Sequence, residues 1–299
     1  MTNEAAISGA KIQVQVSRPE FERQTLDASN IGDVARPLSA WERIVNITAV
    51  RRAFIILLLC CIWQAYAQPL DNPLIFPTFT DTVAAWWQAM STGVLPARVW
   101  VSLRVLLIGY SIGIAIAAVL TTFAVSTRIG TDILSTLTAM FNPLPAIALL
   151  PLALLWFGLG TPSIVFVLIH SVLWPVSMNT HSGFLAVTDT LRMAGNNYGL
   201  TGIRFVLKIL IPAAFPSILT GLKIGWAFAW RTLIAAELVF GVSAGSGGVG
   251  WFIFENRNQL DIASVFAGLL TVIIIGLFME SVVFRIVEDR TVRRWGMQR

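Results

Sequence analysis

Four side chains that could take part in binding or catalysis lie in one long apolar segment, residues 213–240. Lys223, Trp230 and Glu237 are spaced seven apart, so on a helix they fall on nearly one stripe. Lys223 and Glu237 are then about 21 Å apart along the helix axis at 1.5 Å per residue, too far to pair with each other. Arg231 lies near the middle of the segment, where a charge is costly unless it faces water or the interior of a helix bundle.

Two interpretations of Arg231 follow from this position. A guanidinium at membrane depth can replace part of the hydration shell of an oxoanion, which would be a role in binding or passing anions. Alternatively, Arg231 forms a buried ion pair with a carboxylate from a neighbouring helix, because charges at this depth are usually paired. The sequence leaves both interpretations open.

Prolines interrupt a second apolar segment, residues 133–157. Pro143, Pro145 and Pro151 lack the backbone N–H that continues a helix. Such breaks are tolerated at membrane depth only where neighbouring groups or water satisfy the freed carbonyls. The pattern therefore predicts a broken helix beside a pathway.

The sequence contains no recognisable motif for binding a metal ion or a nucleotide. His170 and His181 are eleven residues apart and no Cys/His cluster has metal spacing, which disfavours a metal site. A lone histidine such as His170 on an apolar helix usually packs, although a functional role stays open. Cys60 and Cys61 are adjacent and offer no disulfide framework. No G-x-x-x-x-G-K-[ST] run exists, so we do not expect this chain to hydrolyse ATP. The Ser, His and carboxylate residues show no recognisable catalytic motif, so we do not expect an enzyme.

The segments that carry these residues belong to a membrane protein. Hydrophobic residues make up 56% and charged residues 12% of the 299 residues, against about 45–50% and about 25% in soluble domains. About 20 apolar residues cross a bilayer as a helix. Six such segments are predicted: 48–67, 101–124, 133–157, 163–182, 213–240 and 262–286.

The distribution of basic residues predicts the orientation of these six crossings. The net charge is +5, but most Lys and Arg fall in the stretches that are cytoplasmic if the N-terminus is, while Arg98 and Arg257 fall in the outer loops. Both termini are therefore predicted to be cytoplasmic, in the inner membrane of a bacterium. We expect anionic lipids of the bilayer, not nucleic acid, to be the partner of the surplus charge.

Two local patterns predict how helices pack or lie. Gly109 and Gly113 are four apart, a spacing that lets helices approach closely. The outer connection of residues 68–98 contains Trp86 and Trp87, which favours a short helix at the membrane surface. A glycine-rich outer loop after residue 240 could contact an external partner or close the mouth of a pore.

A polar connection, residues 189–212, joins the fourth and fifth apolar segments. Asp189 and Thr190 can cap a short helix, along which Leu191, Ala194 and Tyr198 recur on one face. Ala194, Gly195 and Gly199 predict a nearly bare ridge that another protein could approach closely. Arg192 marks the membrane side of the connection, and Pro212 is predicted to start the next membrane helix.

The same connection resembles the "EAA" loop of ABC importer permeases. The resemblance rests on Met193-Ala194-Gly195, on Gly199 after three residues, and on Ile209 to Pro212 after nine more. Met193 stands where the family has Glu, and Gly195 replaces the second Ala. Residues 216–238 are similar to permeases of the nitrate, taurine, alkanesulfonate and bicarbonate group, and the whole similarity spans about residues 98–285.

This resemblance implies a type I permease, an all-α membrane fold with six transmembrane helices and a cytoplasmic coupling helix. The coupling helix would dock on a separate ATPase subunit through Arg192, Met193, Ala194, Gly195, Tyr198, Gly199 and Pro212. The translocation pathway would be lined by Asn142, Pro143, Pro145, His170, Trp230, Arg231 and Glu237. Implied partners are two ATPase subunits that bind ATP and magnesium, a second copy of the permease and a periplasmic substrate-binding protein, with no cofactor in this chain.

The predicted organisation is a cytoplasmic extension (1–47), a first transmembrane helix with its outer connection (48–97), a permease domain (98–285) and a cytoplasmic tail (286–299). The expected function is ATP-driven import of a small anion. An ion-coupled secondary transporter is one alternative, and it would need paired broken helices with midplane carboxylates. A membrane scaffold without transport activity is the other.

Overall fold

The computed structural model describes residues 46–70, 72–240 and 247–294. The chain divides into two compact units, Met1–Leu57 and Leu58–Arg299. Most of the predicted extension, and residues 241–246 of the glycine-rich loop, lie outside the described residues. Within the described residues the protein is entirely helical, which confirms the predicted fold class.

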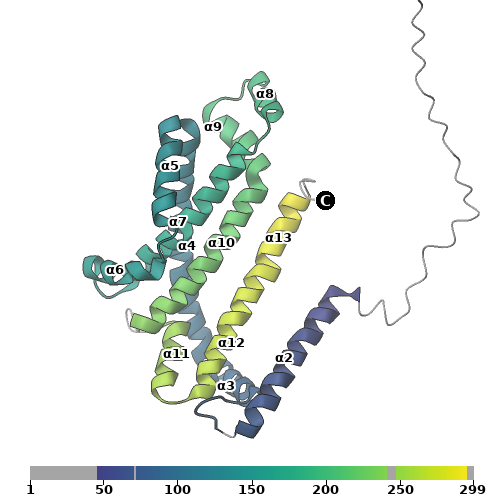
Figure 1. Ribbon diagram of the computed structural model, residues 1–299, viewed down its shortest axis with the longest axis vertical. Coiled ribbons are helices and arrows are strands. Elements are labelled where there is room, and N and C mark those ends of the chain that lie inside the picture. Colours follow the sequence, from purple (N-terminus) through teal and green to yellow (C-terminus); the bar gives the residue numbers. More distant parts are fainter. Residues whose placement is uncertain (1–45, 71, 241–246, 295–299) are drawn as a thin grey trace, which may run out of the picture. The chain divides into compact units, whose positions relative to one another are not determined.

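The helices follow one another with short connections (Figure 1). Their bounds are α2 Thr48–Leu70, α3 Phe79–Ser91, α4 Val94–Ser126, α5 Arg128–Phe141, α6 Leu150–Phe157, α7 Thr161–Leu185, α8 Asp189–Asn197, α9 Gly202–Phe205, α10 Ile211–Phe240, α11 Val249–Asn258, α12 Ile262–Phe278 and α13 Arg285–Glu288. A 3₁₀ turn, η2 (Ala146–Leu149), precedes α6, and π-helical turns occur at η3 (Val206–Leu210), η4 (Met279–Phe284) and η5 (Asp289–Arg293).

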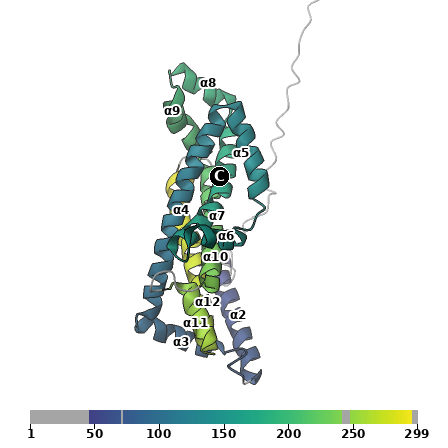
Figure 2. The same cartoon turned by 90° about the vertical axis from the view of Figure 1, so that its left-hand side faces the viewer.

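Five of the described helical stretches are long and apolar enough to cross a membrane. The number of crossings is six if α5 and the stretch Ala146–Phe157 are taken as one span, although the chain bends by 87° between them. The 14 residues of α5 extend only about 21 Å, too short for a bilayer. The break falls at Pro143 and Pro145, as predicted. Figures 1 and 2 show α6 lying across the bundle about midway along α4.

One expectation about the helix that leads into α10 is wrong. Pro212 does not start a membrane helix, because the helix runs without a break from Gly202 to Val239 over 38 residues. The π-turn makes this possible: the N–H of Ile211 donates to the carbonyl of Val206, five residues back. Pro212, which has no N–H to donate, is accommodated directly after this turn.

The helix α4 starts earlier than the apolar pattern predicts, at Val94. Gly93, with a φ of 77°, ends the preceding turn in the left-handed conformation. Pro96 lies in the first turn of the new helix, where its missing N–H costs nothing. Arg98 therefore belongs to α4, and its Nη2 lies 3.1 Å from Oε2 of Glu255 on α11.

The centre of the packing is α7, which lies against α4 on one side and α10 on the other. A Cβ added at Gly109 of α4 would meet the Cβ of Leu168 on α7 at 2.6 Å, and one at Gly113 would meet the Cβ of Val172 at 2.8 Å. The two backbones therefore approach as closely as the spacing of Gly109 and Gly113 predicts.

The short helix expected in the outer connection is α3. The hydroxyl of Thr78 accepts a hydrogen bond from the N–H of Asp81 and caps the N-terminus of α3. The indole of Trp86 donates to the hydroxyl of Thr271 on α12 at 3.1 Å, whereas Trp87 is exposed. Of this tryptophan pair, one residue ties α3 to the bundle and the other faces outward, free to contact the head groups of the bilayer.

The close contact of α4 with α7 can be tested with alanine. We expect Gly109→Ala to destabilise the protein by about 1–3 kcal/mol, because the new methyl group overlaps Leu168. Gly276→Ala on α12 is the matched control, since nothing lies within 4 Å of its added Cβ and alanine favours helices. Thermal unfolding in detergent should show a lower midpoint for Gly109→Ala only. Equal midpoints would show that α4 and α7 do not pack this closely.

Candidate functional site

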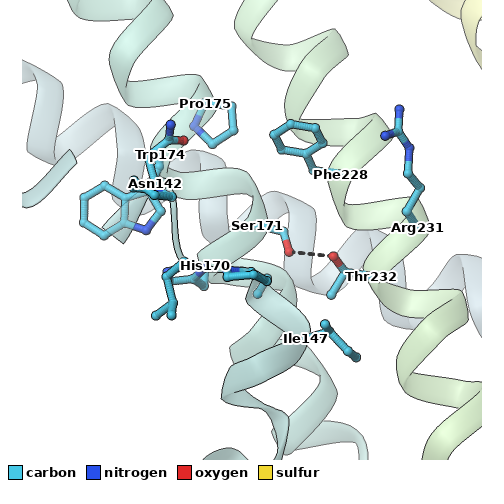
Figure 3. Close-up of a pocket in the computed structure, with 13 residues that line it drawn as sticks. Asn142, Ile147, His170, Ser171, Trp174, Pro175, Phe228, Arg231 and Thr232 are labelled. Carbon is cyan, nitrogen blue, oxygen red and sulfur yellow. Dashed lines mark hydrogen bonds between the residues drawn. The ribbon is translucent and has the colours of Figure 1, made fainter. Parts of the chain in front are cut away.

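A cavity of about 270 Å³ opens between the broken helix, α7 and α10 (Figure 3). Side chains predicted to line the pathway meet at this cavity although they come from three separate segments. These are Asn142, Pro143, Pro145, His170 and Arg231. The break between α5 and η2 forms one wall of the cavity, so the prolines shape it through the backbone.

Ser171 and Thr232 join the two long helices at this cavity. Their hydroxyl oxygens lie 3.1 Å apart in a hydrogen bond between α7 and α10 (Figure 3). Ser171 also donates to the carbonyl of Val167 at 3.1 Å. The pair closes the wall of the cavity where the helices meet.

Aromatic rings of α7 also form part of the wall: His170 and Trp174 line the cavity, whereas Phe141, which packs against them, does not. Phe141 and Trp174 stack with their ring centroids 5.4 Å apart and an interplanar angle of 10°, and His170 packs edge-on against both rings. Trp174 is 7% exposed, and its Nε1 has no hydrogen-bond partner among the described residues, nor do the ring nitrogens of His170. The wall thus holds buried polar groups that a ligand or water could satisfy.

Trp174 was not predicted as a site residue. It follows His170 by four residues and therefore lies on the same face of α7. That spacing is the one signal in the sequence that could have found it. Both interpretations of His170 remain valid, because its ring packs against aromatic neighbours while its nitrogens have no partner within the described residues.

Arg231 is exposed and lies 5.8 Å from the centroid of the Phe228 ring. No ion pair of Arg231 exists among the described residues, so none of them supplies the carboxylate that the second interpretation requires. In Figure 3 its guanidinium points away from His170 and Trp174. Arg231 also borders a second cavity of about 480 Å³, together with Lys223 and Trp230.

The three residues on the stripe of α10, Lys223, Trp230 and Glu237, have structural partners. Lys223 pairs with Glu288 at 2.5 Å. The indole of Trp230 donates to the carbonyl of Val272 on α12 at 3.3 Å. Glu237 lines neither cavity: it is 4% exposed and accepts hydrogen bonds from Ser102 of α4 and from the N–H of Gly250.

Glu237 therefore holds helices together at a place away from the cavity. Gly250 lies in the first turn of α11, where free N–H groups and the helix dipole favour a carboxylate. Ser102 lies 2.8 Å from one carboxylate oxygen and 2.9 Å from the other. The predicted position of Glu237 in the pathway wall is corrected to a junction of α4, α10 and α11.

The predicted coupling helix is α8. Its N-cap is Thr188 and not Asp189 or Thr190, which are the first two residues of the helix, so the predicted cap is wrong. Its end is a Schellman motif: the N–H of Leu200 donates to Gly195 and the N–H of Gly199 donates to Asn196. Gly199 has a φ of 69°, a left-handed conformation that glycine adopts without strain. The glycine of the motif is thus explained by the way the helix ends.

The ridge expected on α8 is only partly exposed. Gly195 is buried, and a Cβ there would meet the ring of Phe205 at 2.8 Å, so this glycine faces its own chain and not a partner. The large apolar side chains that face outward are Leu191, Met193 and Tyr198, of which Tyr198 is 85% exposed. Figures 1 and 2 show α8 at the end of α7 and α10 that is remote from α3 and α11.

Comparison with known proteins agrees with this geometry. Residues 109–293 match the family described as binding-protein-dependent transport system inner membrane component. An ABC transporter permease of Methanocaldococcus jannaschii is 30% identical over 233 residues, covering 77% of this chain and 86% of the relative. An aliphatic sulfonates transport permease of Escherichia coli is 28% identical, covering 81% and 89%. A nitrate import permease of Synechocystis is 30% identical, covering 62% and 66%.

The matched residues include α5 to α12, and with them the broken helix, the cavity and the connection through α8. They leave out α2 and α3. The predicted resemblance is thereby confirmed, and the chain belongs to the binding-protein-dependent transport system inner membrane component family, the type I permeases of ABC importers.

Proposed function

We propose that this permease is the membrane subunit of an ATP-driven importer of small oxoanions, of the sulfonate and nitrate class. The observation that carries the proposal is the position of α8. This helix exposes apolar side chains and directly connects α7 with the helix that continues into α10, the two long helices that border the cavity. A protein that binds α8 can therefore act on both walls of the cavity.

The outward face of α8 suits an ATPase partner. Met193 is 58% exposed and Tyr198 85% exposed, at a connection whose other residues are largely polar. Tyrosine is among the residues that contribute most to protein interfaces. Because the sequence has no phosphate-binding loop, the ATP and magnesium would be bound by two separate ATPase subunits, each seated on α8 of one copy of a permease homodimer.

The residues around the cavity could replace part of the hydration shell of an anion. Arg231 supplies a positive charge, and Asn142 and Trp174 supply N–H donors from the other two segments. Relatives named for aliphatic sulfonates and for nitrate support an oxoanion as the substrate. A periplasmic binding protein would deliver it at the end of the bundle where α3 and α11 lie.

Energy would enter through α8. Closure of the ATPase dimer would bring the two copies of α8 together and tilt α7 and α10, which opens the cavity outward, and hydrolysis would reset it. Such a mechanism needs helices that move as packed units between two arrangements. The close glycine contacts between α4 and α7 supply one packed unit of this kind.

The docking surface is tested by Tyr198→Ala. We expect the affinity for the ATPase subunit to fall at least about 30-fold, the effect of losing a hot-spot aromatic residue. Asn196→Ala, another exposed position on α8, should change it little. The measurement is co-purification and titration of the ATPase from membranes of the native host. Wild-type affinity of Tyr198→Ala would rule out this surface. Gly199 is a poorer position for the test, because any side chain there is strained.

The anion pathway is tested by Arg231→Leu in proteoliposomes that contain the complete transporter. ATP-driven uptake of labelled taurine or nitrate should fall about tenfold or more, since a hydrogen bond to a charged group is worth about 1.5–3 kcal/mol. Arg231→Lys should retain part of the uptake. Arg257→Leu, which removes an exposed charge from α11, is the control. Unchanged uptake by folded Arg231→Leu would reject the role of this charge.

A further inference from the structure

The C-terminal end of α7 is held by a side chain from the next helix. Nη2 of Arg192 donates to the carbonyl of Phe184 at 2.6 Å, and Nε donates to the carbonyl of Val187 at 3.2 Å. Both carbonyls lie at or just beyond the end of α7; that of Phe184 accepts only a long 3.4 Å hydrogen bond from the N–H of Val187 and a tight-turn contact from Ala186, not a regular helical bond from four residues on. A guanidinium is favoured there, because the C-terminus of a helix carries partial negative charge.

This pair of hydrogen bonds directs Arg192 away from the docking surface. Its side chain is half-buried, whereas its neighbours Leu191 and Met193 are exposed. In the sequence Arg192 was grouped with the residues that contact the ATPase. The structure instead turns it toward the membrane helices of its own chain.

A second contact attaches α8 on its other side. Gly195 lies against Phe205 of α9 and Ile209 of η3, and both belong to the helix that continues as α10. Thus α8 holds α7 through Arg192 and α10 through Gly195. The first attachment is polar and directional, while the second is a close van der Waals contact.

There is room for α8 to move relative to α4. A cavity of about 340 Å³ lies beside Arg192, lined also by Ser126 of α4 and by Gly202 and Val206. Because this space is not filled by side chains, a shift of α8 would not have to displace packed residues of α4. The hydrogen bonds of Arg192 would carry the shift to α7.

We propose that Arg192 is a positioning residue that transmits the movement of α8 to α7, and is not a docking residue for the ATPase. The inference rests on the proposed ATP-driven function. Without Arg192, α8 remains attached to α10 through Gly195 and keeps its exposed Tyr198, so the ATPase binds and hydrolyses ATP. Only the movement of α7, which carries His170 and Trp174, is lost.

The test measures this movement directly in the full complex, with ATP as the probe. Spin labels are placed at Met178→Cys on α7 and Ile224→Cys on α10, two positions that are partly exposed, after Cys60 and Cys61 are replaced by serine. Pulsed electron resonance then gives the distance between the labels with and without ATP. The rate of ATP hydrolysis is measured on the same samples.

In Arg192→Met we expect the ATP-dependent change in this distance to fall below half of the wild-type change, while hydrolysis stays within about twofold. Arg192→Lys should recover part of the change, because an ammonium group can donate to these carbonyls without the planar fork of arginine. Arg128→Met, which removes an exposed charge at the start of α5, should behave as the wild type. If Arg192→Met does not fold, Arg192→Lys carries the test with a reduced change.

Two results would overturn the inference alone: a full distance change in Arg192→Met, or loss of the ATPase from the complex, which would make Arg192 a docking residue after all. A wild-type complex in which ATP produces no distance change would instead overturn the proposed function together with the inference. The two failures are therefore distinguishable.

Discussion

The arrangement of this permease depends on how closely α7 approaches its two neighbours. Within a membrane, lipid tails are as apolar as the side chains, so helices associate mainly through close packing and polar contacts. Because Gly109 and Gly113 have no side chain, the backbone of α4 approaches α7 closely. Gly221 of α10 lies against Asn179 of α7 in the same manner. A larger side chain at Gly221 would push apart α7 and α10, the two long helices that border the cavity.

The closely packed helices α7 and α10 face an irregular segment. The chain turns by 87° between α5 and the stretch that leads into α6, because Pro143 and Pro145 cannot continue a helix. One side of the cavity is thus formed by two packed helices, and the other by the irregular backbone between α5 and η2. This asymmetry suits a pathway that must hold its shape and still offer polar groups.

Charges near the helices are mostly accounted for by their neighbours. Lys223 pairs with Glu288, Arg98 with Glu255, and Glu237 takes hydrogen bonds from Ser102 and Gly250. These contacts tie α4, α10, α11 and α13 together. Arg231 differs: within the part of the chain that the structure describes it forms no ion pair, and it lies 5.8 Å from the centroid of the Phe228 ring.

The sequence by itself determined what depends on local backbone chemistry. The prolines predicted the break after α5, the spacing of Gly109 and Gly113 predicted a close helix contact, and the interval from Gly199 to Pro212 identified the family. Gly199 could be recognised because a left-handed helix end needs glycine whatever surrounds it.

Only the tertiary structure decided which way side chains face and what they meet. In the structure Gly195 faces Phe205, Arg192 faces the end of α7, and Glu237 faces the start of α11. Trp174 lines the cavity although it was not predicted as a site residue. Each of these contacts joins different elements of the fold. Periodicity reports the face of a helix on which a residue lies, but it carries no information on which other element covers that face.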